Sequence, residues 1–409
     1  MFMKIKSLHL RAFRGIEDMV LDFDDHLNVI AGENGVGKST ILDAVSMILS
    51  GLFHKIGFID HKKTHAPDSS DTKVGHDRCE ILAKMVFFGS EIEVYVDSTG
   101  EIGYAMDFEI AKKTYTPAHL NDPENRMPAA VHYRTNRYVT EVPIDPYSDF
   151  KVDRRDAHVF PLSSEVVDFE AFFEWFRNTE DFENEERVRD SSFRDRDLDA
   201  VRESIYFITG FSNMRIMRKR LSLQLEKLGD SLDIRKFSDG EKGLVAMVGD
   251  LARRLSIANP GSENPLHEEG VVLIDEMELH LHPAKQRRII RELQVAFPNC
   301  QFFISTHSPQ VLGEVSPENI ILLRRAKKGN VEAVVPGRSF GLDSNIILED
   351  LMGAPSQNEE VERALARIFV LIDKEKFAEA KKAIGNLRKK VGIQLPGMTR
   401  AETLIAALE

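Results

Sequence analysis

Glycines, a lysine and a hydroxyl residue occur in this sequence at a spacing that suits the binding of a phosphate group. Residues 32–40, which read GENGVGKST, match the pattern G-x-x-x-x-G-K-[ST] at every fixed position. Glycines let backbone N–H groups surround a phosphate without clashes from Cβ atoms. Lys38 would reach the β- and γ-phosphates, and the Ser39 hydroxyl would bind Mg²⁺. The sequence therefore predicts that a nucleoside triphosphate binds here, in contact also with Asn34, Gly35, Gly37 and Thr40.

The residues on both sides of this motif match the structure that it requires. Residues 27–31 are mostly apolar, as in a buried strand, and residues 40–49 carry apolar side chains at helical spacing. A helix that starts here points its partial positive charge at the bound anion. Both flanks favour a phosphate loop over a glycine-rich turn with an incidental lysine.

Two apolar stretches in the second half of the chain end in polar residues that suit the same site. Residues 271–274 precede Asp275 and Glu276. An acid at a strand end helps to hold Mg²⁺, which suits Asp275, and Glu276 is placed to polarise an attacking water as general base. Residues 302–304 lead to His307, which could contact the γ-phosphate, although such a histidine is more often structural.

A helix start at residues 237–241 has two interpretations. Ser238 followed by Glu241 is a capping box, which needs no further function. An exposed helix N-terminus that carries Ser238 and Gly240 is also a site for an anion.

Composition limits the classes of protein that fit. The 409 residues are 42% hydrophobic and 29% charged, as in a globular protein, with a net charge of −12. No apolar run approaches the roughly 20 residues that cross a bilayer. The two cysteines, Cys79 and Cys300, suggest no disulfide framework. We therefore expect a cytoplasmic protein. The negative charge excludes a wholly basic surface, so any DNA contact needs a local patch.

The order of expected elements indicates an α/β fold with helical additions. We expect strands around the phosphate loop, mostly helix at 163–226, a return to α/β after residue 237, and amphipathic helices at 359–387 and 401–408. The expected divisions are 1–160, 161–230 as a helical insertion, 231–338, and 339–409 as a helical extension.

These motifs, in this order, resemble those of the ATP-binding-cassette (ABC) ATPases, particularly the SMC/RecF-like branch. Residues 32–40 resemble its Walker A motif, 237–241 its signature motif, 271–276 its Walker B motif, and His307 its switch histidine. Arg14 resembles an arginine that touches nucleotide in that branch. The glutamine loop has no clear match, with Arg137 in the comparable region, and the turn at 278–283 also departs from the usual form.

The resemblance implies an ABC head with a mixed β-sheet that binds and hydrolyses ATP with Mg²⁺. It implies head-to-tail dimers in which Ser238, Gly240 and Glu241 of one chain complete the site around Lys38 of the other. ATP would then hold the dimer together, and hydrolysis would release it.

The tail resembles the C-terminus of compact anti-phage ATPases, especially the Septu defence ATPases, which work beside a separate HNH nuclease. Residues 341–344, 348–353 and 371–373 carry this resemblance, together with 380–387 and 395–396. The tail would either dock that partner or cap its own cassette. One alternative is a RecF-like repair ATPase that clamps DNA through Arg215, Arg218, Lys219 and Arg220. Another is an ATP-gated scaffold, against which Glu276 argues.

Overall fold

The computed structural model describes residues 3–59, 64–104, 122, 125–136, 154–158, 162, 169–219, 221–326, 330–354 and 358–409. The chain forms two compact units, Met1–Leu342 and Asp343–Glu409. The segment 161–230, which the sequence suggested as an insertion, lies within the first unit. None of the helices in the described part of the chain has both the length and the apolar character that crossing a bilayer requires.

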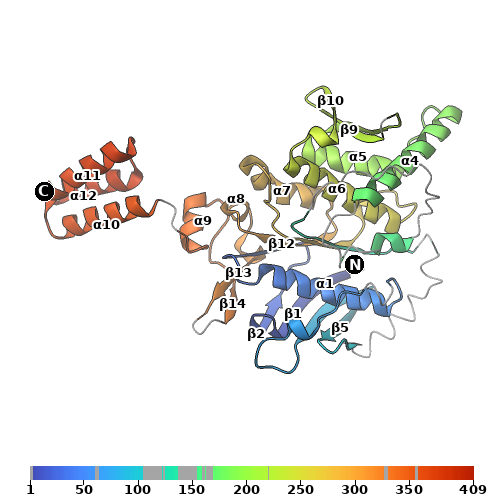
Figure 1. The fold of residues 1–409 in the computed structure, drawn as a ribbon, viewed down its shortest axis with the longest axis horizontal. Coiled ribbons are helices and arrows are strands. Elements are labelled where there is room, and N and C mark those ends of the chain that lie inside the picture. The colour runs from blue at the N-terminus through green and yellow to red at the C-terminus, as the bar shows by residue number, and fades with distance from the viewer. Residues whose placement is uncertain are drawn as a thin grey trace. The chain divides into compact units, whose positions relative to one another are not determined.

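A six-stranded mixed sheet forms the centre of the first unit (Figure 1), in the order β14-β13-β3-β12-β11-β7. Its parallel strands are β3 (Leu27–Gly32), β7 (Ala129–Tyr133), β11 (Gly270–Ile274), β12 (Cys300–Thr306) and β13 (Ile320–Arg325), and β14 (Val331–Val334) pairs antiparallel with β13. Every residue of β3, β7, β11 and β12 is buried, as in a parallel sheet covered on both faces. Because these strands are parallel, their carboxyl ends meet at one edge.

Helix α1 (Lys38–Lys55) lies between this sheet and a second, antiparallel sheet. The second sheet has the order β2-β1-β4-β5-β6 and consists of β1 (Met3–Phe13), β2 (Ile16–Asp22), β4 (Glu80–Phe87), β5 (Ser90–Asp97) and β6 (Ile102–Tyr104). The helix contacts β3, β7, β11 and β12 on one side and β4 and β5 on the other. Contact with two sheets explains why α1 is buried nearly all round rather than along one stripe.

The opposite face of the central sheet is covered by helices. Helix α6 (Asp239–Ala258) contacts β7 and packs against α4 (Phe169–Arg189) and α5 (Arg196–Thr209). Helix α7 (Pro283–Ala296) packs against α5 and the short α8 (Pro309–Leu312). The apolar stripe predicted in α4 is confirmed, since the four phenylalanines that form the stripe are buried: Phe169, Phe172, Phe173 and Phe176.

The prediction of mostly helix over 163–226 is wrong in its last part. Strands β8 (Ser212–Met217), β9 (Ser222–Lys227) and β10 (Asp230–Asp233) form a three-stranded antiparallel sheet. Buried and exposed residues alternate along β8, where Met214 and Ile216 face inward, and this is the period of a strand. Leu228 and Gly229 both have positive φ and turn the chain between β9 and β10. Residues 163–168 lie outside the described residues.

The second unit contains α9 (Ser344–Asp350), α10 (Glu359–Asp373), α11 (Phe377–Val391) and α12 (Pro396–Leu408). The expected continuous helix over 359–387 is two helices, separated by a turn in which Glu375 has φ 58°. The predicted apolar face is confirmed, because α10, α11 and α12 share a core of Leu365, Ile368, Ile372, Ala380, Ile384, Leu387, Met398, Ala401 and Ile405.

A buried histidine in the first unit makes its stability sensitive to acid. His158 is 1% exposed and lies against the rings of Phe53 and Phe58, with centroid distances of 4.7 and 5.2 Å. Burial, assisted by Arg254 and Arg154, lowers the pKa of His158 to about 3. The folded protein keeps this ring neutral, whereas the unfolded chain gains a proton below about pH 6.5. The stability present above that pH is therefore lost as the pH falls toward 3.

We predict that His158→Asn makes the free energy of unfolding less dependent on pH. Between about pH 7.5 and 5.5 the variant should lose about 1.4 kcal/mol less than the parent protein, measured by chemical denaturation. The exposed His26→Asn variant is the control. An unchanged pH dependence in His158→Asn would contradict the assignment.

Candidate nucleotide site

Close backbone contacts fix the shape of the phosphate loop between β3 and α1. Gly32, Gly35 and Gly37 have φ values of 146°, 69° and 110°, which residues with a Cβ rarely adopt. A Cβ on Gly32 would lie 2.6 Å from the carbonyl oxygen of Leu323 in the neighbouring strand β13. Glycine is therefore required here by the adjoining strand as well as by the turn.

The side chain of Lys38 folds back over this loop. Its Nζ donates to the carbonyl oxygens of Gly32 and Glu33 at 3.0 and 2.9 Å, and it lies 3.3 Å from Nδ1 of His307. Burial lowers the pKa of Lys38, although the carboxylates of Glu276, Asp275 and Glu278 act in the opposite direction. The ammonium group thus lies inside the loop, where a phosphate loop places its β- and γ-phosphates.

Ser39 and Asp275 bring two oxygen ligands together at the start of α1. The Ser39 hydroxyl donates to Oδ2 of Asp275 at 2.8 Å, and Asp275 is 6% exposed. Ser305 donates to the other carboxylate oxygen, which fixes the orientation of Asp275. A hydroxyl and a carboxylate fit Mg²⁺, which prefers oxygen ligands and commonly binds nucleotide phosphates through one or two carboxylates.

Glu276 is held in an unusual backbone conformation directly after β11. Its φ is 47°, in the left-handed region that is unfavourable for a residue with a Cβ. Its N–H donates to the Ser305 hydroxyl at 2.8 Å, and the next N–H, of Met277, donates to the Ser305 carbonyl at 3.1 Å. The surrounding structure therefore fixes this conformation, which leaves the carboxylate 38% exposed and 3.9 Å from Nε2 of His307.

His307 lies between Lys38 and Glu276. Burial and the charge of Lys38 lower the pKa of His307, which favours a neutral ring at neutral pH. A neutral ring can accept a hydrogen bond from Lys38 through Nδ1. Glu278 fixes the backbone at His307. Its carboxylate accepts a hydrogen bond from the His307 N–H and another, at 2.8 Å, from the Thr306 hydroxyl.

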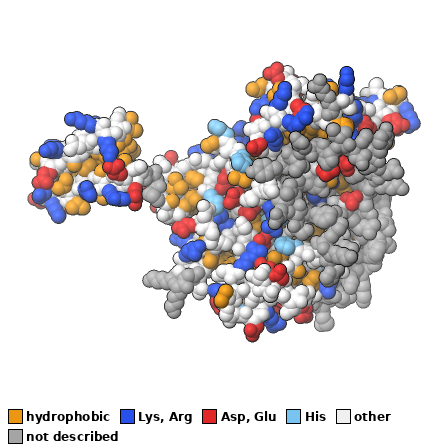
Figure 2. Space-filling model, viewed as in Figure 1, with side chains coloured by type: hydrophobic (Ala, Val, Ile, Leu, Met, Phe, Trp, Pro, Cys, Tyr) orange, Lys and Arg blue, Asp and Glu red, His pale blue; other side chains and the backbone are white. Residues whose placement is uncertain are grey.

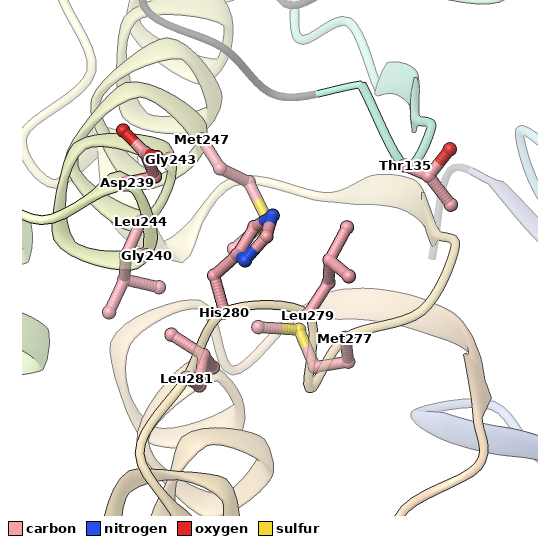
Figure 3. A pocket seen from close by; sticks show the side chains of 10 residues that line it. All are labelled: Thr135, Asp239, Gly240, Gly243, Leu244, Met247, Met277, Leu279, His280 and Leu281. Carbon is pink, nitrogen blue, oxygen red and sulfur yellow. The ribbon is translucent and has the colours of Figure 1, made fainter.

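The signature residues form a separate group. Ser238 caps α6: its hydroxyl accepts from the Glu241 N–H at 3.4 Å, and Glu241 accepts from the Ser238 N–H at 3.0 Å. A Cβ on Gly240 would lie 2.1 Å from the carbonyl oxygen of His280, so the start of α6 rests on the turn that follows Glu276. Figure 3 shows the pocket between these elements, which is lined by Thr135, Asp239, Gly240, Gly243, Leu244, Met247, Met277, Leu279, His280 and Leu281.

The structure thus brings together one part of the predicted site and not the other. Lys38, Ser39, Asp275, Glu276 and His307 form one connected set. Among the hydrogen bonds of the described residues, none joins Ser238, Gly240 or Glu241 to residues 32–40. Asn34 and Gly35 are exposed and Thr40 is half-buried, so all three are open to a ligand.

The arginines proposed from the sequence have different surroundings. Arg14 forms ion pairs with Asp43 at 2.6 Å and with Asp71 at 2.8 Å, and its contact with nucleotide stays a prediction. Arg137, considered for the glutamine loop, lies outside the described residues, as does Arg220 of the possible DNA-binding cluster. Arg218 of that cluster is paired with Glu180 and Asp181.

Sequence reasoning missed three residues that organise this site: Ser305, Glu278 and Asp43. Ser305 and Glu278 orient Asp275, Glu276 and His307 through contacts between different strands and turns. Asp43 lies four residues after Ser39, so helical spacing alone could have placed it on the same face of α1. Within the described residues, no group of three His, Cys, Asp or Glu side chains is arranged to hold a metal ion.

Comparison with known proteins gives matches over most of the chain. Residues 139–313 match the family model "AAA domain, putative AbiEii toxin, Type IV TA system", and residues 7–125 match the model "AAA domain". The chain is 28% identical to "Retron Ec83 probable ATPase" of Escherichia coli, over 95% of this chain and 84% of that protein. This chain is an ATPase.

Two further matches extend this comparison. The chain is 28% identical to "Septu protein PtuA" of Bacillus mycoides, over 87% of this chain and 48% of that longer protein. The SMC head domain from Thermotoga maritima matches 82% of this chain and 100% of that domain, with 16% identity and a TM-score of 0.45. The similarity to the retron and Septu proteins confirms the family resemblance expected from the motifs.

We predict that Glu276→Gln lowers kcat for ATP hydrolysis about 100-fold or more, because an amide cannot accept the proton of the attacking water. ATP binding should persist, since Lys38 and the loop are unchanged. Phosphate release and the binding of a fluorescent ATP analogue measure the two effects. Lys38→Ala, which should lose binding, is the comparison, and unchanged turnover in Glu276→Gln would exclude the general-base role.

Proposed function

We propose that this ATPase works as a head-to-tail dimer, in which each ATP is held between Lys38 of one chain and Ser238 of the other. The separation of the two groups of site residues carries this proposal. Lys38, Ser39, Asp275 and His307 form a connected surface for phosphates, whereas Ser238 presents the exposed start of the 20-residue helix α6. The N-terminus of such a helix favours an anion, and the phosphate of an ATP bound to a second chain can supply that anion.

Each residue has a defined task in the proposed reaction. Lys38 and the loop N–H groups bind the phosphates, and Ser39 and Asp275 would hold Mg²⁺, which neutralises phosphate charge when bound. Glu276 takes a proton from the attacking water. Neutral His307 lies beside Lys38 and Glu276, where it can contact the γ-phosphate. Ser238 and Gly240 of the second chain cover that phosphate and exclude bulk water, while the attacking water stays beside Glu276.

We further propose that ATP controls a separate nuclease in an anti-phage defence complex. The similarity of the chain to a retron ATPase and to a Septu protein supports this proposal. The helical unit Asp343–Glu409 has its own apolar core, which makes it suitable as a docking module. We propose this unit as the site that binds the nuclease.

The alternative of a RecF-like ATPase that clamps DNA directly has less support. Arg218 of the proposed basic cluster is neutralised by two carboxylates. On the face shown in Figure 2, acidic and basic side chains of the described residues are interspersed. A nucleic-acid surface is normally a concentrated basic patch.

We predict that Ser238→Arg and Lys38→Ala are each inactive and that mixing them restores turnover. In a mixed dimer, Lys38 from the first variant meets Ser238 from the second, which gives one intact site. Equal mixing should restore roughly a quarter of the parent rate, because half of the dimers are mixed and each holds one site of two. Ser231→Arg, which adds the same charge on an exposed serine, is the control. Activity in Ser238→Arg alone, or no recovery on mixing, would exclude the shared site.

We predict that removal of the residues after Gly353 leaves an ATPase that no longer binds its nuclease. Unit Met1–Leu342 has its own core, so its melting temperature should change little. Co-expression with a candidate HNH nuclease and co-purification measure the partner. Collapse of the remaining unit would show that the tail is a structural cap instead.

A further inference from the structure

Two consecutive residues at the end of β7, Tyr133 and Arg134, contact different parts of the nucleotide machinery. Tyr133 ends β7, next to the Walker B strand β11, and Arg134 and Thr135 follow it. Successive residues of a strand point to opposite faces of a sheet. At the end of β7, one side chain therefore faces α1 and the next faces α6, the helices that cover the two faces of β7 (Figure 1).

Arg134 reaches the helix that carries the phosphate-loop lysine. Its Nη1 lies 2.7 Å from Oδ1 of Asp43, and Arg14 occupies the other oxygen of this carboxylate at 2.6 Å. Burial alone would raise the pKa of Asp43, but Arg134 and Arg14 outweigh burial and lower it, so the carboxylate is charged. Asp43 is one helical turn from Ser39, on the same face of α1. Arg134 thereby fixes α1 close to its Mg²⁺ ligand.

Tyr133 reaches the opposite face of the sheet. Its hydroxyl donates to Oδ2 of Asp250 in α6 at 3.0 Å, and Asp250 is itself held by Arg253 and Arg254. These three charged residues are at most 3% exposed, so α6 cannot shift here without breaking buried ion pairs. The carbonyl oxygen of Tyr133 accepts from the N–H of Asp275 at 2.8 Å.

Thr135 faces the same pocket as the signature motif. It lines the pocket of Figure 3 together with Asp239 and Gly240 from the first turn of α6. Tyr133 and Arg134 thus connect α1, Asp275 and helix α6 within one short segment, and Thr135 faces the adjoining pocket.

We propose that Arg134 is a positioning residue for ATP hydrolysis, acting through Asp43. Its ion pair fixes α1 relative to the end of β7, and Tyr133 extends that alignment to Asp275 and to α6. Binding of ATP depends on Lys38 and the loop, which Arg134 does not contact. Loss of Arg134 therefore misaligns the reacting groups and leaves the affinity for ATP largely intact.

The test is the steady-state ATPase activity of the full-length chain carrying Arg134→Gln, Arg134→Lys or Asp43→Asn. Arg134→Gln should lower kcat about tenfold while KM changes less than about twofold, since alignment and not binding is lost. Arg134→Lys should recover part of kcat, because a single ammonium contact can replace the single Nη1 contact. The double variant Asp43→Asn/Arg134→Gln should be no slower than Asp43→Asn alone, as expected for two residues that act together.

Arg126→Gln is the matched control, because Arg126 also pairs with a carboxylate, that of Glu268 at 3.3 Å, and has similar exposure outside the site. Arg126→Gln should retain the parent kcat even where its melting temperature changes as much as that of Arg134→Gln. The proposal is overturned if Arg134→Gln keeps the parent kcat, if its only effect is a raised KM, or if Arg126→Gln loses kcat equally. In this test each variant is measured alone, and all variants are compared at one protein concentration. The result is therefore separate from the mixing of Ser238→Arg with Lys38→Ala, which tests the dimer.

Discussion

The contact between Ser39 and Asp275 is the interaction on which the site depends. It joins residues 236 positions apart in the sequence, at 2.8 Å. Only a parallel sheet that places the carboxyl ends of β3, β12 and β11 at one edge brings these side chains together. This contact between Ser39 and Asp275 depends on the buried apolar strands, on helix α1 between the two sheets, and on the small residues of the loop.

A carboxylate at this position must be held in one orientation although it is 6% exposed. Ser39 and Ser305 donate hydrogen bonds to its two oxygens, so both buried acceptors have a partner. Ser305 also fixes the backbone of Glu276 in its left-handed conformation. One serine at the end of β12 thus orients both the proposed Mg²⁺ ligand and the proposed base.

The sequence was informative where the physical cause of structure is local. The phosphate loop, the two acids after a buried strand and the capping box of Ser238 depend on neighbours within a few residues, and all could be placed in advance. The β8–β10 sheet was missed because its strands are short and follow two helices, so helical spacing was extended too far. Ser305 and Glu278 were missed because their partners lie on other elements, and no spacing rule reveals such contacts. Asp43 was missed although its helical spacing from Ser39 places both residues on one face of α1.

The turn that follows Glu276 contacts both the signature helix and His307, and this bears on how ATP could influence a partner. Gly240 packs directly on the carbonyl of His280, and Glu278 in the same turn holds the backbone of His307. A shift of His307 at the γ-phosphate would therefore move the turn on which the signature helix rests. Since packed elements change between discrete arrangements rather than deform gradually, the start of α6 and the switch histidine should move together. That coupling would allow one chain to respond to the nucleotide held by the other.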